Sequence, residues 1–443
     1  MRTSRIVAVG AAGIAAALAL SACSSGGSGN TGGDDSSANA GTIGKVDGSG
    51  RTLTVWSMTG DLSDDTIAAI NKEFESETGA TVKVETQQWT DIATKITTAL
   101  ATDTPPDVID IGNTQVSTFA ASGGLADLTA YKDAFAQGQT WLGGLADPAM
   151  VDGKLYAVPS FGAARGVIYN KTIWEKAGVT EAPTTYDELK ADLDKVKAAN
   201  PSTDFSSFYL PGQNWYAGMQ WVWDAGGDIA TLENGKWVAG FSSSEAQSGL
   251  TAWQQFQNAY SSKASQTLNT DKPDQDQVFA DGKAGAIVAN YWSIAHIQTL
   301  NKKLTDDDFG TFAMPGVSGK TQPVMLAGSD WGIAAKSKNQ DLARVWVKIA
   351  ASPDIQKTNV VKDGWIPNST EGAQTAADAA SDLAKPFFEA AVNDSKATPA
   401  SGSWAQLEDP GMKQFFQSMA SGAKSVSDAA TSWDDTVNST LNQ

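Results

Sequence analysis

The chain has 443 residues, and its 32 Lys and Arg against 50 Asp and Glu give a formal net charge of −18 at pH 7. This acidity argues against nucleic acids and anionic substrates as partners. The chain has one histidine, His296, and one cysteine, Cys23, which argues against His-based catalysis and excludes an internal disulfide or a Cys-based metal site.

The first 22 residues have the pattern of a signal peptide. Arg2 and Arg5 precede the apolar run Ile6–Leu20, which is too short to span a bilayer. The following Leu20-Ser-Ala-Cys23 resembles a bacterial lipobox, which implies cleavage before Cys23 and a lipid such as palmitate on that residue. An ordinary signal peptide with an incidental cysteine is the alternative. We therefore expect an extracytoplasmic lipoprotein anchored to the outer face of the cell membrane, with residues 23–50 as a flexible tether.

The part from Arg51 to Gln443 is too long for one core and indicates two domains. It begins with alternating strand and helix patterns: strands at Leu53–Ser57, Thr81–Glu85 and Asp107–Ile111, and helices at Asp64–Glu77 and Asp91–Leu100. This order is typical of a parallel sheet covered by helices. Ligands of such sheets bind beyond the carboxyl ends of the strands, here Ser57–Asp61 and Gly112–Gln115.

The remaining chain continues the mixed pattern. It predicts strands at Tyr156–Pro159, Gly166–Tyr169 and Ala284–Ala289, a hairpin around Glu233–Gly235, helices at Thr184–Ala199, Ser244–Tyr260 and Asn339–Ala351, and several helices toward Gln443. Ser160–Arg165 consists mostly of small residues that can flex. A crossing between the domains is expected at Thr311–Gly316.

The stretch Pro211–Ile229 predicts a helix that starts after Asn214 and stops at Gly226-Gly227. Most of its large side chains are expected on one face: Trp215, Met219, Val222 and Trp223. Trp221 is expected to point the other way. Two interpretations remain open: a core helix, or a ligand platform in which Trp215 and Tyr216 lie beside the free N–H groups of the first turn.

Several motifs follow one another along Arg51–Gln443: Leu53–Trp56, Pro106–Asp110 with Ala121–Leu128, Asp152–Pro159, Ile168–Lys171 with Glu175–Gly178, Pro183–Leu189, Phe279–Trp292 and Ser337–Pro353. Together they resemble the extracellular sugar-binding lipoproteins of ABC transporters, of the maltose-binding-protein type (solute-binding protein family 1). Thr94–Gln115 and Ala327–Lys348 are similar to actinobacterial N,N′-diacetylchitobiose-binding proteins in particular.

The resemblance implies an α/β fold of the periplasmic-binding-protein-like class II, with two α/β lobes joined by hinge strands around a ligand cleft. It implies an N-terminal lobe of residues 51–162 and 316–370, and a C-terminal lobe of residues 163–315 and 371–443. The implied partners are an oligosaccharide, the permease subunits in the membrane and, indirectly, a cytoplasmic ATPase. The protein is expected to be a monomer without a cofactor.

The resemblance also implies ligand-binding positions in both lobes: Ser57, Met58, Asp61, Asn113, Thr114, Gln115, Ser329, Asp330 and Trp331 in the first, and Trp215, Tyr216, Trp292 and Trp404 in the second. The family often has a carboxylate where Thr114 stands and a charged residue near Ala163. These departures argue against a maltose-like specificity. Arg165, close to Ala163, is a candidate for contact with a sugar or acetamido oxygen; an ion pair that stabilises the hinge is the alternative.

Other tryptophans and acidic groups receive simpler interpretations. Trp89 and Trp365 are expected at the cleft rim, whereas Trp56, Trp223, Trp346 and Trp433 are expected in packing. The acidic segments Asp271–Asp276 and Asp306–Asp308 do not match an EF-hand, so solvated loops are expected, with a Ca²⁺ site as the alternative.

Two classes of function remain to be compared. The first is a transport-linked binding protein for N,N′-diacetylchitobiose or a short chitooligosaccharide, with cellobiose, xylobiose, maltose or trehalose as alternatives. The second is a secreted glycosidase using two carboxylates. No carboxylate pair in the sequence suggests opposed faces of one bond, so a binding protein that is not an enzyme is predicted.

Overall fold

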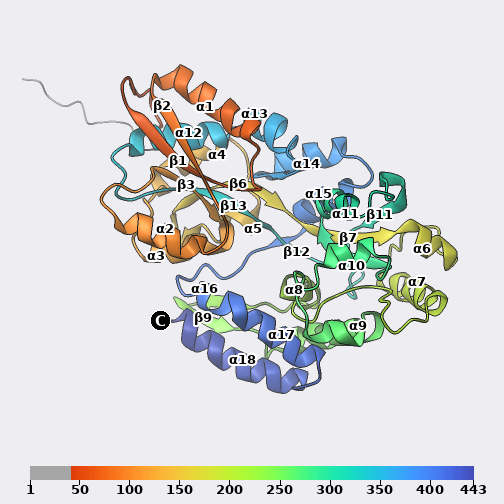
Figure 1. Ribbon diagram of the computed structural model, residues 1–443. Coiled ribbons are helices and arrows are strands. Elements are labelled where there is room, and N and C mark those ends of the chain that lie inside the picture. Colours follow the sequence, from red (N-terminus) through yellow and green to blue (C-terminus); the bar gives the residue numbers. More distant parts are fainter. Residues whose placement is uncertain (1–40) are drawn as a thin grey trace, which may run out of the picture. The chain divides into compact units, whose positions relative to one another are not determined.

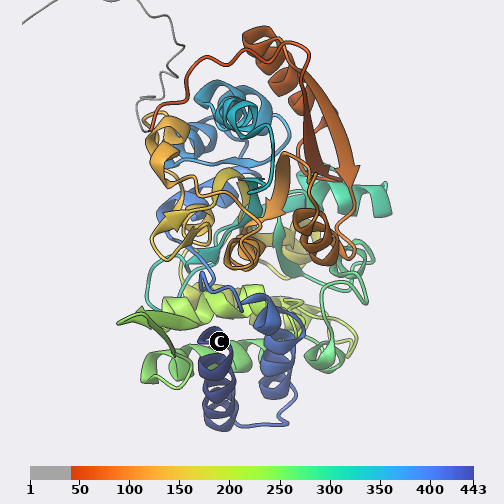
Figure 2. The same cartoon turned by 90° about the vertical axis from the view of Figure 1, so that its left-hand side faces the viewer.

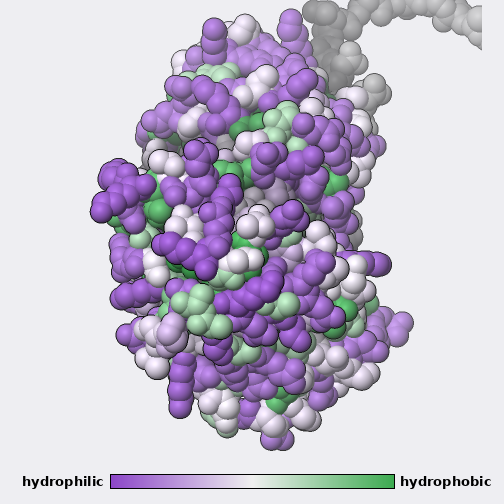
Figure 3. All heavy atoms as spheres, turned by 90° about the vertical axis from the view of Figure 1, so that its right-hand side faces the viewer, coloured by the Kyte–Doolittle hydropathy of each residue, from purple (hydrophilic) through white to green (hydrophobic). Residues whose placement is uncertain are grey.

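The computed structural model describes residues 41–443. The predicted signal peptide, Cys23 and most of the predicted tether lie outside the described residues. Among the helices of residues 41–443, none is long and apolar enough to cross a membrane. The face seen in Figure 3 is mostly hydrophilic, with hydrophobic residues scattered in small groups. Single exposed apolar residues of this kind are ordinary on a protein surface.

A six-stranded sheet has the strand order β14-β6-β13-β3-β1-β2 (Figure 1). Its strands are β1 (Thr52–Met58), β2 (Thr81–Gln87), β3 (Val108–Gly112), β6 (Ala157–Ala163), β13 (Ala327–Ile333) and β14 (Ile366–Pro367). β1 pairs in parallel with β2 and β3, which confirms the prediction from the alternating strands and helices. β13 lies antiparallel between β3 and β6, so a late part of the chain completes the middle of the sheet.

Helices α1 (Asp64–Thr78), α2 (Ile92–Ala101) and α12 (Gln340–Ala350) accompany this sheet. α1 begins after Ser63, whose side chain accepts a hydrogen bond from the backbone N–H of Thr66, and ends at Gly79 with a φ of 71°. Its buried residues recur at the helical spacing that the sequence predicted: Ile67, Ile70 and Phe74. Complete burial of each such side chain stabilises the fold by about 1.5–3 kcal/mol relative to exposure.

A second, three-stranded sheet has the order β10-β7-β11, all antiparallel. Its strands are β7 (Arg165–Asn170), β10 (Ala286–Asn290) and β11 (Phe309–Phe312). An aromatic-rich core lies with it and includes residues of α7 (Tyr186–Ala199), α8 (Trp215–Asp224), α9 (Ser244–Tyr260), α17 (Lys413–Ala420) and α18 (Val426–Leu441). The two larger sheets of residues 41–443 therefore have separate hydrophobic cores.

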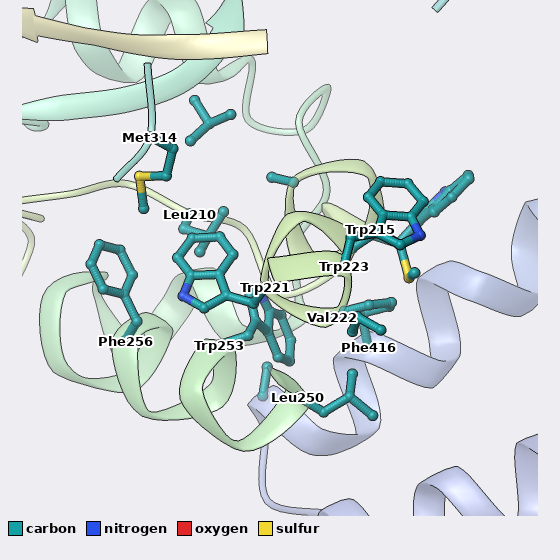
Figure 4. Packing of buried hydrophobic residues seen from close by; sticks show 14 of the residues in the cluster. Leu210, Trp215, Trp221, Val222, Trp223, Leu250, Trp253, Phe256, Met314 and Phe416 are labelled. Carbon is teal, nitrogen blue, oxygen red and sulfur yellow. The ribbon is translucent and has the colours of Figure 1, made fainter. Parts of the chain in front are cut away.

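Helix α8 lies inside the second core. Asn214 caps its start by accepting a hydrogen bond from the backbone N–H of Ala217, as the sequence predicted. The expectation of one buried face was incomplete, because Trp221 on the other side is also buried and packs 5.2 Å from the ring of Phe256 on α9 (Figure 4). α9 approaches closely at Gly249, where a Cβ would lie 2.7 Å from the Cα of Val222. The absence of a side chain at Gly249 therefore permits this helix contact.

The chain passes from the first sheet to the second between β6 and β7. β6 continues to Ala163 and β7 begins at Arg165, so Ser160–Arg165 is almost entirely strand rather than the flexible segment that its small residues suggested. Backbone pairing with β13 holds it in place. The parallel pair β12 (Val324–Met325) and β15 (Ser395–Lys396) lies outside both sheets. The lobe boundaries predicted from the sequence stay a prediction.

The hairpin of β8 (Ala230–Glu233) and β9 (Lys236–Ala239) was also predicted and is confirmed. Figure 2 shows it beside the C-terminus, where the Asn442 side chain bonds both backbone polar groups of Trp237. The remaining elements are α3 (Val116–Ala121), α4 (Lys132–Ala136), α5 (Gly143–Ala146), β4 (Met150–Val151), β5 (Lys154–Leu155), α6 (Lys171–Lys176), α10 (Gln275–Ala280), α11 (Ser293–Leu300), α13 (Pro353–Ile355), α14 (Thr370–Ala379), α15 (Lys385–Asn393) and α16 (Ala405–Leu407).

Candidate ligand-binding cleft

Three pockets adjoin one another: two lie beyond the carboxyl ends of β1 and β3, and the third lies beside the start of β7 and the end of β10. The aromatic pocket, of about 710 Å³, is lined by Thr59, Gly60, Asp61, Trp89, Phe161, Ala163, Tyr291, Trp292, Ala295, Ala327, Gly328, Ser329, Asp363, Gly364 and Trp365. The central pocket, of about 500 Å³, includes Trp89, Asn113, Thr114, Gln115, Arg165, Tyr216, Gly328 and Glu408. The polar pocket, of about 250 Å³, includes Arg165, Asn214, Tyr216, Asp271, Asp274, Gln275, Asp276, Asn290 and Trp292.

Shared wall residues join these pockets into one cleft. Trp89 borders the aromatic and central pockets, Arg165 borders the central and polar pockets, and Trp292 borders the aromatic and polar pockets. A larger groove of about 1310 Å³ lies elsewhere, against the β8–β9 hairpin and residues 395–403. Its walls contain none of the ligand residues predicted from the sequence, so the cleft is the better candidate site.

The aromatic pocket is built from both sheets. Trp292 follows β10 and leaves 45% of its surface exposed, which is unusual for so large an apolar side chain. Its ring meets that of Trp365 edge to face at 5.1 Å, and Trp365 packs 4.5 Å from the ring of Phe161 on β6. The indole N–H of Trp365 donates to the backbone oxygen of Asp61 at 3.1 Å. These contacts hold aromatic faces in fixed positions around the pocket.

Two carboxyl groups lie at the carboxyl ends of β1 and β3. Asp61 accepts a hydrogen bond from the Ser329 hydroxyl at 2.9 Å. Burial raises the pKa of Asp61 to about 6, against the lowering effect of hydrogen bonds from Ser329 and Trp89. Asp110 is wholly buried and accepts from the backbone N–H of Met58 at 3.2 Å; burial and the nearby charge of Asp61 raise its pKa well above the usual range. The cleft can thus present a hydrogen-bonding acid group near neutral pH.

The central pocket has polar walls from the short helix Asn113–Gln115 that follows β3. Asn113 donates to the backbone oxygens of Gly144 and Leu326, at 3.1 and 3.0 Å, so its amide holds the wall together. Thr114 donates to the Glu408 carboxylate at 3.1 Å. Burial raises the pKa of Glu408 to about 7, and the hydrogen bond from Thr114 opposes that rise.

Tyr216 and Arg165 form one unit between the central and polar pockets. The Arg165 guanidinium lies 4.5 Å from the centre of the Tyr216 ring. On its other side Tyr216 packs 4.0 Å from Trp215, which in turn lies 6.1 Å from Trp404. Burial lowers the pKa of Arg165, and the Tyr216 oxygen opposes this change. An ion pair of Arg165 with an acid, the alternative considered above, is not formed among the described residues.

The structure separates the predicted ligand residues into two groups. Eight line the cleft: Asp61, Asn113, Thr114, Gln115, Arg165, Tyr216, Trp292 and Ser329. Six are buried and line none of its three pockets: Ser57, Met58, Trp215, Asp330, Trp331 and Trp404. Trp331, for example, packs edge to face on Trp346, 4.8 Å away. Trp215 and Trp404 support the wall at Tyr216 from behind.

Other cleft residues were not among the predicted ligand contacts. Trp89 and Trp365, expected at the rim, both line the aromatic pocket. Glu408 carried no local signal, because a polar residue in a loop resembles many others. Asp276 belongs to the acidic segment Asp271–Asp276, which was expected to be a solvated loop. Asn290 directly precedes Tyr291 and Trp292, so the turn after β10 was the signal that could have identified it.

Comparison with known proteins identifies the family. Residues 59–357 match the family described as bacterial extracellular solute-binding protein. The chain belongs to this family. It is 37% identical over 348 residues to the diacetylchitobiose binding protein DasA of Streptomyces coelicolor, covering 78% of this chain and 79% of that protein. This membership agrees with the prediction of a binding protein rather than an enzyme.

Solved structures agree on the fold. The GacH receptor of Streptomyces glaucescens matches with a TM-score of 0.71 and 24% identity, over 88% of this chain and 98% of that one. The maltose-binding protein MalE of Listeria monocytogenes matches with a TM-score of 0.74 and 22% identity, over 88% and 97%. The predicted mixed α/β, periplasmic-binding-protein type of fold is therefore confirmed.

Proposed function

We propose that the protein captures N,N′-diacetylchitobiose or a short chitooligosaccharide for an ABC importer. The observation that carries this proposal is the cleft, where exposed aromatic faces adjoin a pocket of hydrogen-bonding groups. Pyranose rings pack their apolar faces on indole rings, while their hydroxyls need directed donors and acceptors. Trp292 offers the apolar face, and Arg165, Asn290 and Asp276 offer the polar groups.

The similarity to DasA supports chitobiose in particular, because it extends over most of both chains. Cellobiose, xylobiose, maltose and trehalose are the alternative ligands of the same cleft. Thr114 argues against a maltose-like ligand. Members of the family often have a carboxylate at this position, whereas this chain has a threonine whose hydroxyl is already bonded to Glu408.

The proposal includes a transport cycle. A ligand that contacts both α/β lobes stabilises the closed arrangement, and the permease subunits recognise that arrangement. The division into residues 51–162 with 316–370, and 163–315 with 371–443, is part of this proposal. So are cleavage before Cys23 and a lipid anchor on Cys23, which would keep the protein at the outer face of the membrane.

The test is a titration of the purified protein with chitobiose, cellobiose, xylobiose, maltose and trehalose. Isothermal calorimetry and intrinsic tryptophan fluorescence should both report saturable binding, strongest for chitobiose. Fluorescence is a suitable readout because Trp292 and Trp365 line the cleft. Saturation by another disaccharide alone would refute chitobiose and leave the sugar-binding function standing. Release of N-acetylglucosamine from chitobiose during incubation would contradict a function in binding alone.

A further inference from the structure

The polar pocket contains four hydrogen-bonding atoms that are buried and unpaired. Among the described residues, no partner exists for Nη1 of Arg165, Oδ1 of Asn290, Oδ1 of Asp276 or Oε1 of Gln275. Asn290 is 9% exposed and Asp276 is 6% exposed, and all four side chains line the pocket. Buried polar atoms in folded proteins are nearly always paired, so four unpaired atoms in one small pocket point to a polar ligand.

The backbone places the Arg165 and Asn290 residues side by side. Asn290, the last residue of β10, is the direct register partner of Arg165, the first residue of β7. Opposite residues of antiparallel strands project to the same face with their Cβ atoms roughly 5 Å apart. The Arg165 guanidinium packs over the Tyr216 ring and does not bond Asn290. One donor and one acceptor therefore stand together and remain available.

The third atom is also held in place. His296 Nδ1 lies 2.9 Å from Oδ2 of Asp276, and Oδ1 of Asp274 accepts the backbone N–H of Asp276 at 3.0 Å. The first contact holds the Asp276 side chain and the second holds its backbone, and Oδ1 has no hydrogen-bond partner among the described residues. The unpaired atoms of the pocket are thus one donor and three acceptors.

The complement of this set is a ligand with one acceptor and several donors on one ring. A secondary amide has one acceptor oxygen and one donor N–H on separate atoms of a rigid plane, and a neighbouring hydroxyl supplies the second donor. We propose that Arg165 and Asn290 together read the acetamido group of an N-acetylhexosamine ring, and that Asp276 accepts a hydroxyl of the same ring. This inference rests on the proposed sugar-binding function and names the residues that determine its specificity.

A bound cation is the competing interpretation of the same pocket. Asp274, Asp276 and His296 bring three possible ligand atoms within 4.8 Å of one another. The guanidinium of Arg165 lines the same pocket, however, and a positive charge there opposes a second cation. The amide interpretation uses the Arg165 donor, which a cation site leaves unpaired.

The experiment compares chitobiose with cellobiose, because the two share their glycosidic linkage and differ in acetamido against hydroxyl groups. Calorimetric affinities are measured for the wild type, Arg165→Met, Asn290→Leu and the milder Asn290→Ser. Asn258→Leu, at an exposed position outside the cleft, is the matched control. Circular dichroism and thermal unfolding of each variant show whether it is folded.

We expect the wild type to bind chitobiose about 10- to 100-fold more tightly than cellobiose. Cellobiose lacks the acetamido groups, so its complex leaves one or two buried polar groups of the pocket unpaired. Both Asn290 variants and Arg165→Met should weaken chitobiose binding at least about tenfold and change cellobiose binding less than about threefold. The preference for chitobiose over cellobiose should thus be lost in these variants and retained in Asn258→Leu.

Other results overturn the inference. Equal losses for the two sugars, or an unchanged preference, would show that the pair does not read the acetamido group, although sugar binding would stand. Stoichiometric Zn²⁺ binding by the wild type, or loss of chitobiose binding in EDTA, would make the pocket a cation site instead. A wild type that binds no sugar would refute the proposed function itself.

Discussion

Replacing Trp292 by alanine removes the largest exposed aromatic surface of the cleft. With a side-chain surface of roughly 250 Å², the 45% exposure of Trp292 leaves on the order of 110 Å² for a sugar ring. Covering half to all of this area contributes roughly 1.5–3 kcal/mol at about 25 cal/mol per Å². Trp292→Ala should therefore weaken chitobiose binding by about 10- to 100-fold, the range of a hot-spot aromatic.

Isothermal calorimetry with the purified protein provides this measurement, and Trp292→Phe should recover part of the loss because a smaller ring still packs on the sugar. Leu300→Ala is the matched control, since Leu300 is also exposed, is the last residue of helix α11, which begins directly after Trp292, and lines none of the three pockets. An affinity of Trp292→Ala within about twofold of the wild type would refute the assignment of Trp292 to the site and the area argument with it.

Three further predictions concern stability. Glu408→Gln should raise the Tm more at pH 8 than at pH 5. The pKa of Glu408 is raised to about 7 in the folded protein, so this carboxyl destabilises the fold increasingly as the pH rises above its usual pKa and favours the charged form. A larger gain in Tm at pH 5 would contradict this sign. Gly249→Ala should lower the free energy of unfolding by about 1–3 kcal/mol in urea, since its Cβ meets the backbone of Trp221 and Val222, and a neutral result would disprove the tight α8–α9 contact. Asp434→Ala should cost about 2–3 kcal/mol, because it removes the acceptor of the Phe241 and Ser242 N–H groups, at 3.0 and 2.7 Å; an unchanged urea midpoint would refute it.

Local patterns were sufficient for one part of the fold. The alternation in β1, β2 and β3 and the periodicity of α1 are properties of neighbouring residues, and the parallel pairing followed from their order. β13 is different, because its place between β3 and β6 depends on pairing with strands far away in the chain. The crossing at Ser160–Arg165 shows the same limit, since small residues indicated flexibility and pairing with β13 made most of it a strand.

The predicted ligand residues divide into residues that line the cleft and residues that are buried, and contacts between distant parts of the chain again decide which is which. Trp292 and Trp404 are the same residue type and each stands next to a serine, yet one is 45% exposed and the other is fully buried. Trp404 is buried because it meets Trp215 on α8, a contact that no local pattern predicts. Trp292 stays exposed because it stands at the end of β10 with Trp365 on one edge only. Sequence position after a strand was therefore a better guide than aromatic character.

Under the proposed function, the position of Arg165 would connect ligand recognition with movement of the two lobes. Ala163, at the end of β6, lines the aromatic pocket, and Arg165, at the start of β7, lines the polar pocket, so one residue of backbone separates the two walls. This same backbone joins the six-stranded sheet to the three-stranded sheet. A rotation about it would change the alignment of the aromatic and polar pockets. A disaccharide that packs one ring on Trp292 and places the other against Arg165 and Asn290 fits a single alignment, so under the proposed function its binding free energy selects that arrangement.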